Sequence, residues 1–152
     1  FPPLPDGIEE SVKYSNSKWS TQHGADGRKR SIYIYQQRTL TMPLMQSFDS
    51  LVCEESKPLR QNSITALQAL AMYNGGFVNL ETKHFAKRVQ KLAGQKPENQ
   101  IDVAYNLALG RGPSDEERRH MKKFMLNYSA INDPVEGLCR VLFNSNEFIY
   151  ID

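Results

Sequence analysis

Two carboxylates stand in settings that suit acid or base chemistry. Asp49 lies among turn-forming residues, and Glu147 follows a helix end within an Asn-rich stretch. A general acid and a general base must converge on one pocket, and sequence position alone does not bring these two side chains together. The structural alternative is that Asp49 caps a turn. In the same alternative Glu147 pairs with Arg111 or Arg140, and we favour this interpretation for both carboxylates.

The histidines and cysteines lack the spacing of a metal site. His23, His84 and His120 are isolated from one another, and no C-x-x-C, H-x-x-x-H or C-x-x-C-H pattern occurs. Cys53 and Cys139 are too few for a structural zinc or iron–sulfur site. We therefore expect no metal and no cofactor in this chain. The cysteines leave open two buried thiols, one reactive thiol or one disulfide bridge.

Charge and hydropathy argue against nucleic-acid and membrane partners. The chain carries 19 Lys and Arg against 17 Asp and Glu, a net charge of +2. The basic run at 28–30, followed by Tyr33 and Tyr35, has the elements of a stacking platform beside phosphate contacts. We favour a strand with a charged preceding loop, because the rest of the chain lacks a basic face. No apolar run approaches the roughly 20 residues of a membrane span.

Nucleotide-binding and nucleophile motifs are absent from the sequence. P-loop, G-x-G-x-x-G and G-x-S-x-G patterns do not occur. The glycine-rich segment 110–113 suits a turn between two helices better than a phosphate cradle. Without a self-contained catalytic motif, we expect no enzymatic activity from this chain alone. A contribution to an enzyme that is completed elsewhere stays open.

The chain changes character near residue 60. Residues 1–62 hold five of the eight prolines and one β-type run at 31–35, with a weaker second strand at 18–20. An isolated two-stranded ribbon is marginal in water, so we expect this extended arm to lie on a helical body formed by 63–152. The expected fold is mainly α, a compact bundle of about five helices whose arm has room for one small β-hairpin. Arm and body together form one domain, a fragment of a larger protein.

Local start and stop signals predict the first two helices of the body. Thr65 and Gln68 form a capping box that begins a helix. This helix ends near Asn74, where Gly75-Gly76 offer the left-handed conformation that is common at helix ends. A second helix is expected over 78–93.

Three further helices share one amphipathic spacing. Apolar residues recur at i, i+3, i+4 and i+7, which places them on one face of a helix. The sets are Ile101, Ala104, Tyr105 and Ala108; Met121, Phe124, Met125 and Tyr128; and Val135, Leu138, Cys139 and Leu142. Gly110 ends the first of these helices. Ser114 and Glu117 form a capping box for the second, and Asp133 caps the third.

Several strings, taken in order, resemble one family. They are FPPLPDG at 1–7, RKRSIYIYQQRT at 28–39, MPLMQSFDS at 42–50, ITALQALAMYNGGFV at 64–78, AYNLALGRGPSDEE at 104–117 and LCRVLFNSNEFIYID at 138–152. Together they resemble the C-terminal part of the planctomycete-type domain of unknown function, which ends large exported bacterial proteins with upstream cytochrome-c-like domains. The resemblance spans nearly the whole chain.

This resemblance implies a setting rather than an activity, since the family has no established one. It implies export to the periplasm or cell surface, with haem c in upstream domains only. The implied partners are the upstream domains of the same polypeptide, and a glycan is a further candidate. In an oxidising compartment, a Cys53–Cys139 bridge becomes an alternative to a free, buried Cys139.

The polar positions that match the family pattern form the candidate site. They are Arg38, Asp49, Cys53, Arg60 and Asn74, and a structural role for each is the alternative. One function is a structural or interaction module, which predicts exposed apolar patches. The other is part of a carbohydrate-active enzyme completed by missing upstream domains, which predicts a cleft where Arg38, Asp49 and Arg60 converge. We favour the module.

Overall fold

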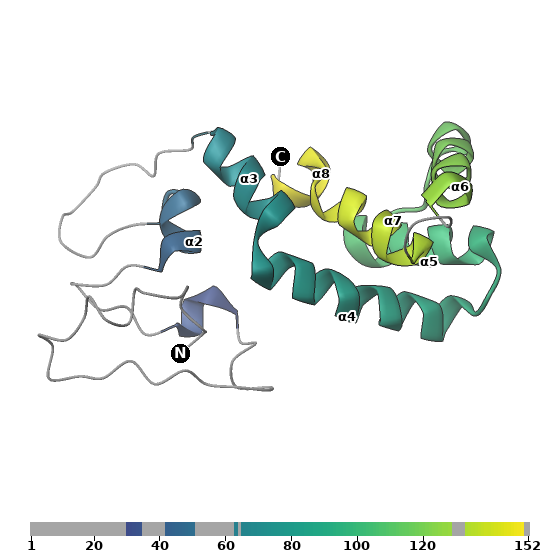
Figure 1. The fold of residues 1–152 in the computed structure, drawn as a ribbon, viewed down its shortest axis with the longest axis horizontal. Coiled ribbons are helices and arrows are strands. Elements are labelled where there is room, and N and C mark those ends of the chain that lie inside the picture. The colour runs from purple at the N-terminus through teal and green to yellow at the C-terminus, as the bar shows by residue number, and fades with distance from the viewer. Residues whose placement is uncertain (1–29, 35–41, 51–62, 64, 129–132, 151–152) are drawn as a thin grey trace, which may run out of the picture. The chain divides into compact units, whose positions relative to one another are not determined.

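The structure, a computed structural model, describes residues 30–34, 42–50, 63, 65–128 and 133–150. Contacts divide the chain into two units, Phe1–Ile64 and Thr65–Asp152. All regular elements among the described residues are helical (Figure 1). The predicted mainly α fold class is therefore confirmed.

The first unit has a 3-10 turn where we predicted a strand. Its described elements are η2 (Ser31–Tyr33) and α2 (Pro43–Ser47). In η2, Ile32 and Tyr33 are exposed, and no strand is present among the described residues to pair with this segment. A strand without a partner leaves its backbone polar groups unpaired, whereas the turn bonds two amides to carbonyls three residues earlier. The predicted partner strand at 18–20 lies outside the described residues.

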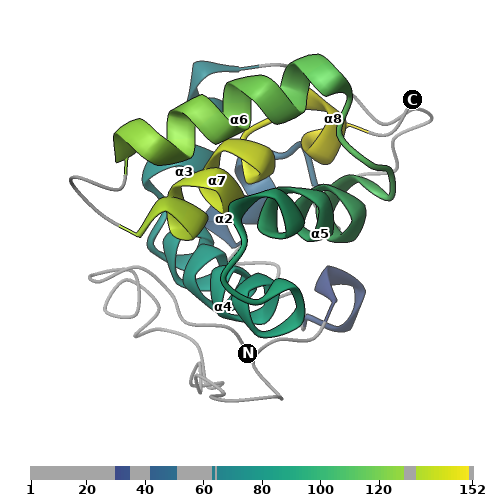
Figure 2. The same cartoon turned by 90° about the vertical axis from the view of Figure 1, so that its right-hand side faces the viewer.

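The second unit contains the five predicted helices and one further short helix. In chain order they are α3 (Ala66–Asn74), α4 (Gly76–Ala93), α5 (Pro97–Leu109), α6 (Asp115–Tyr128), α7 (Pro134–Phe143) and α8 (Asn146–Ile149). Helix α7 packs against α4, α5 and α6, which surround it in Figure 2. The core consists of Ala86, Val89, Ile101, Ala104, Tyr105, Met125, Val135, Leu138, Cys139 and Leu142. Helix α7 contributes more of these residues than any other helix.

Helix caps form where the sequence predicts them. The Thr65 hydroxyl accepts the Gln68 amide at 3.3 Å, and the Gln68 side chain accepts the Thr65 amide at 3.1 Å. Helix α5 ends at Gly110, which is left-handed with φ 72°. The Asp133 carboxylate accepts the Val135 amide at 2.9 Å at the start of α7. These contacts satisfy backbone groups that helix ends leave unpaired.

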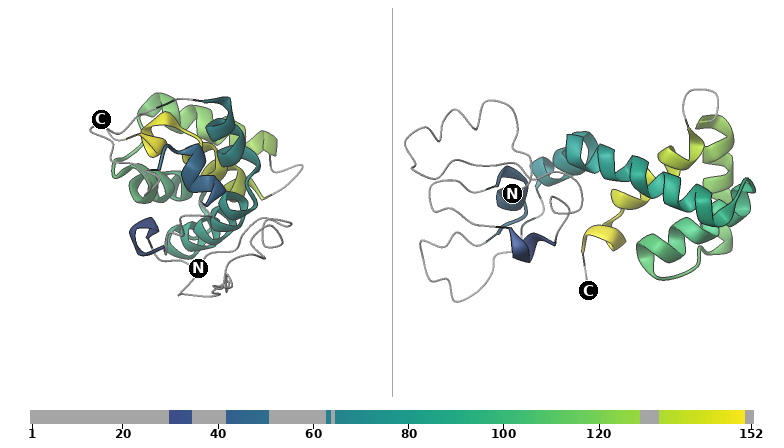
Figure 3. Two further views of the ribbon diagram at one scale, coloured as in Figure 1. Left: turned by 90° about the vertical axis from the view of Figure 1, so that its left-hand side faces the viewer. Right: turned by 90° about the horizontal axis from the view of Figure 1, so that it is seen from below.

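The bend between α3 and α4 differs from our prediction. Gly75 has φ −59°, so it is not left-handed, and α4 begins directly after it at Gly76. In Figure 3 the teal ribbon passes from α3 into α4 without a long loop. Glycine is needed at 75 for a different reason, since a Cβ there would collide with the Ala71 carbonyl oxygen of α3. At Gly76 a Cβ would meet no atom within 4 Å. The missing side chain at 75 thus lets the two helices join without a loop.

The two adjacent glycines should respond oppositely to alanine. Gly75→Ala is expected to lower the free energy of unfolding by about 1–3 kcal/mol, because the colliding atom is backbone and cannot rotate away. Gly76→Ala, the matched control, should raise it by about 0.5–1 kcal/mol, since alanine loses less chain entropy in a helix. Urea unfolding followed by far-UV circular dichroism measures both. A Gly75→Ala variant as stable as wild type would contradict the collision.

Candidate functional site

Asp49, the first candidate, holds together two distant parts of the first unit. It follows α2 and has φ 54°, a left-handed conformation that Asp tolerates better than most residues. Its Oδ2 accepts the backbone amide of Ser63 at 2.7 Å and the Ser63 hydroxyl at 2.6 Å. Asp49 and Ser63 lie 14 residues apart in the sequence, so these hydrogen bonds join two segments of the first unit. Asp49 has a structural contact of the kind we favoured, over a longer range.

The described residues do not test the other four candidates as a group. Arg38, Cys53 and Arg60 lie outside the described residues. Asn74 is the exposed last residue of α3, and its backbone carbonyl accepts the Asn79 side-chain amide at 3.5 Å. Asp49 belongs to the first unit and Asn74 to the second. The five-residue site therefore stays a prediction.

Cys139 is a free thiol at the centre of the second unit. It is fully buried between Leu138 and Leu142 in the core. Burial, with smaller contributions from Asp133 and Glu136, raises the pKa of Cys139 to about 12. The thiol therefore stays protonated and unreactive at neutral pH. Cys53 lies outside the described residues, and the free Cys139 gives the predicted Cys53–Cys139 bridge no support.

Metal-ligand clusters and membrane-spanning helices are both absent from the described residues. Within the described parts of the chain, no group of three or more His, Cys, Asp or Glu side chains is placed to hold a metal ion. None of the helices described here is long and apolar enough to cross a bilayer.

The strongest polar cluster surrounds Arg111, in the turn between α5 and α6. Its Nε and Nη2 donate to the two Glu147 oxygens, both at 2.7 Å. Its Nη1 and Nη2 donate to the two Glu117 oxygens at 2.9 and 2.8 Å, and Nη1 also reaches the Gly112 carbonyl at 3.1 Å. The guanidinium carbon lies 5.7 Å from the centroid of the Tyr105 ring. All five N–H groups of the arginine are used, and the predicted Glu147 pair with Arg111 is confirmed.

Glu117 serves two contacts at once. Its Oε2 accepts the Ser114 amide at 2.7 Å, and its own amide donates to the Ser114 hydroxyl at 3.2 Å, which forms the predicted capping box. The hydrogen bond from Arg111, followed by those from Ser114, lowers the pKa of Glu117 to about 2. Arg111 likewise lowers the pKa of Glu147. The three side chains are 32–46% exposed, so solvent screens these pairs, although bidentate geometry on both sides favours them.

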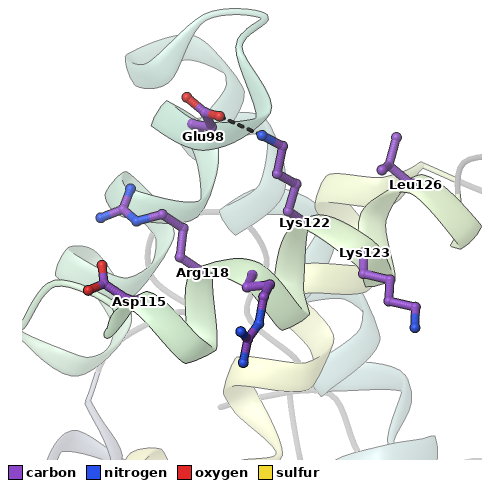
Figure 4. Close-up of a pocket in the computed structure, with 7 residues that line it drawn as sticks. Glu98, Asp115, Arg118, Lys122, Lys123 and Leu126 are labelled. Atoms are coloured by element: carbon purple, nitrogen blue, oxygen red, sulfur yellow. Dashed lines mark hydrogen bonds and ion pairs between the residues drawn. The ribbon is translucent and has the colours of Figure 1, made fainter.

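A second cluster lines a hollow of about 370 Å³ between α5 and α6 (Figure 4). Its lining consists of two carboxylates, four cations and one leucine: Glu98, Asp115, Arg118, Arg119, Lys122, Lys123 and Leu126. Lys122 reaches Glu98 at 2.6 Å, and Arg118 reaches Asp102 of α5 at 2.5 Å. The hydrogen bond from Lys122 lowers the pKa of Glu98. Two ion pairs thus join α6 to α5.

This hollow was not predicted from the sequence. The signal was present as two carboxylates one helical turn apart in α5, at 98 and 102, and two cations with the same spacing in α6, at 118 and 122. The carboxylates and cations can pair only if the two helices lie side by side and antiparallel. The spacing of residues within each helix does not establish that. The hollow is therefore a property of the packed bundle.

These features define a small domain that is helical where described. Its Arg111 network joins helices of the domain to one another. The chain belongs to the PSD1 family of proteins of unknown function (DUF1553), whose family model matches residues 4–125. The predicted membership of a family of unknown function is confirmed. Comparison with curated proteins and with solved structures found no match.

Replacement of Glu117 tests the Arg111 network through its pH dependence. Glu117→Gln keeps a capping-box residue but removes the charge. Because folding depresses the pKa of Glu117 from 4.5 to about 2, its contribution is present above about pH 4.5 and is lost as pH falls towards 2. Wild type should be more stable than Glu117→Gln at neutral pH, and this difference should shrink steadily below pH 4.5. Urea unfolding across this range measures it.

Glu116→Gln is the control for this experiment, since it changes the same charge on the same helical turn outside the Arg111 network. Its difference from wild type at neutral pH should be smaller than that of Glu117→Gln. A Glu117→Gln difference that persists unchanged to the lowest pH would contradict the role of the ion pair.

Proposed function

We propose that this chain is a structural and interaction module, and that α3 is the helix by which it docks onto another part of its polypeptide. The observation that carries this proposal is that α3 exposes its large apolar side chains and buries a polar one. Seven of its nine residues are apolar, yet its one buried residue is Gln68. Leu67, Leu70 and Tyr73 are 69%, 54% and 58% exposed. A helix that is apolar all round is normally covered by protein.

Exposed apolar side chains also occur in the first turns of α4. Phe77 and Leu80 are 50% and 51% exposed. With the three α3 side chains, they place five large exposed apolar residues within the stretch 67–80. Elsewhere in the described residues, such side chains are spread more thinly along the chain. This concentration supports an interaction surface, which the module hypothesis predicted.

Contacts with the rest of the body hold α3 in place. The Arg140 guanidinium of α7 donates to the Tyr73 carbonyl at 2.6 Å and lies 4.7 Å from the centroid of the Tyr73 ring. At the other end, the Tyr150 hydroxyl lies 3.5 Å from the Gln68 side-chain oxygen. A helix anchored near both ends presents its apolar side chains in a fixed arrangement. Such preorganisation reduces the entropy lost when a partner binds.

The family resemblance supplies the setting of this proposal. It favours an exported multidomain bacterial protein, located in the periplasm or at the cell surface, whose upstream domains cover α3. The alternative role in a carbohydrate-active enzyme ranks second, because the Asp49 carboxylate is bonded to Ser63. A glycan-binding screen that compares wild type with Asp49→Ala tests that alternative separately.

Hydrogen exchange tests the docking of α3 directly. Amides of residues 66–80 are compared in the full-length gene product and in the isolated chain 1–152. Covering of α3 should slow their exchange in the full-length protein, at least tenfold if docking contributes about 1.4 kcal/mol. Leu67→Ser with Leu70→Ser in the full-length protein should return the exchange to the rate of the isolated chain.

The matched control is Leu92→Ser, which alters a leucine that is 59% exposed at the far end of α4. This variant should leave the protection of residues 66–80 intact. Equal exchange in the full-length and isolated proteins would refute docking of α3 onto the upstream domains. A concentration-dependent dimer of the isolated chain that protects α3 would instead assign the covering surface to a second copy.

A further inference from the structure

The cations of α6 form two rows that differ in their partners. Arg118 and Lys122 form the inner row, and each is paired with a carboxylate of α5. Arg119 and Lys123 form the outer row, also one helical turn apart, and neither has an ion-pair partner among the described residues. Both rows line the same hollow. The charge left unneutralised in the hollow is therefore that of the outer row.

We propose that this hollow binds an acidic segment of a partner protein. Arg119 and Lys123 receive two carboxylates spaced one helical turn apart, and Leu126 receives an apolar side chain one turn further on. The guanidinium of Arg119 presents a planar fork that matches a carboxylate, and Lys123 adds a point charge. This surface is distinct from α3, so the inference goes beyond the proposed docking.

The openness of the hollow favours a macromolecule over a small molecule. Leu126 is 69% exposed, and the Lys122 and Glu98 side chains are 51% and 60% exposed. A small ligand usually needs a site that buries about 70–90% of its surface. A segment that lies along α6 gains its contacts from length instead.

The acidic residues of the hollow favour a protein segment over nucleic acid. Glu98 and Asp115 lie among the four cations. A nucleic-acid strand carries a charge at every nucleotide, so part of it would lie against these carboxylates. A protein segment places its charges at chosen positions and also supplies an apolar residue for Leu126. The mixed lining therefore discriminates between the two classes.

Binding of a synthetic peptide tests the proposal. The probe is a labelled helical peptide with Glu at i and i+4 and Leu at i+7, measured by fluorescence anisotropy at low salt with the chain 1–152. Arg119→Gln with Lys123→Gln should weaken binding roughly tenfold, because two exposed charge pairs are lost. Leu126→Ala should weaken it by a smaller factor. Circular dichroism should show an unchanged fold, since all three positions are on the surface.

Lys83→Gln with Lys87→Gln is the matched control. It removes the same charge at the same spacing from exposed positions on α4, outside the hollow. This variant should change binding less than twofold. An equal loss in the control would overturn the proposal, since it would show general charge attraction. So would equal binding of an isomeric peptide with Glu at i and i+2, or tighter binding of a single-stranded oligonucleotide that depends on Arg119 and Lys123.

Discussion

The Arg111 guanidinium is the contact on which the arrangement of three helices depends. It binds Glu117 at the start of α6 and Glu147 in α8, directly after the left-handed Gly110 that ends α5. Because Glu117 also closes the α6 capping box with Ser114, one carboxylate fixes both the first turn of α6 and its position relative to α5. Exposed ion pairs are individually weak, but a planar group bound bidentately on two sides fixes direction as well as distance.

Packing around α7 completes the arrangement that this network begins. The stacked rings of Phe124 and Tyr128 lie against Gly137, where a Cβ would come within 2.8 Å of the Tyr128 ring. The missing side chain therefore allows α6 to approach α7 closely.

The family match ends at residue 125, before α7, yet α7 supplies Leu138 and Leu142 to the core. The core therefore combines residues inside the matched range, such as Ile101, with α7 residues beyond it.

The helices were predictable because their signals are local. Capping residues such as Thr65 and Asp133, and apolar spacing over two turns, act within a few residues of the backbone they control. The 3-10 turn at 31–33 was not predictable in this way, because a strand depends on a partner that β-propensity does not supply. The hydrogen bond from Ser63 to Asp49 was not predictable either, because it joins segments that no local pattern connects. The ion pairs between α5 and α6 and the exposure of α3 were also not predictable, because both depend on which helix faces pack together.

The two proposed interaction surfaces differ in physical kind. Helix α3 presents apolar area, whose contribution to association grows with the area removed from water and has little directional preference. The α6 hollow presents charges, which weaken in salt but steer and orient a partner. Helices α3 and α6 lie towards opposite ends of the helical body (Figure 1). A partner that covers α3 leaves the hollow accessible, so one contact can hold the module while the other orients a second partner. A single mixed patch would make these two contacts compete.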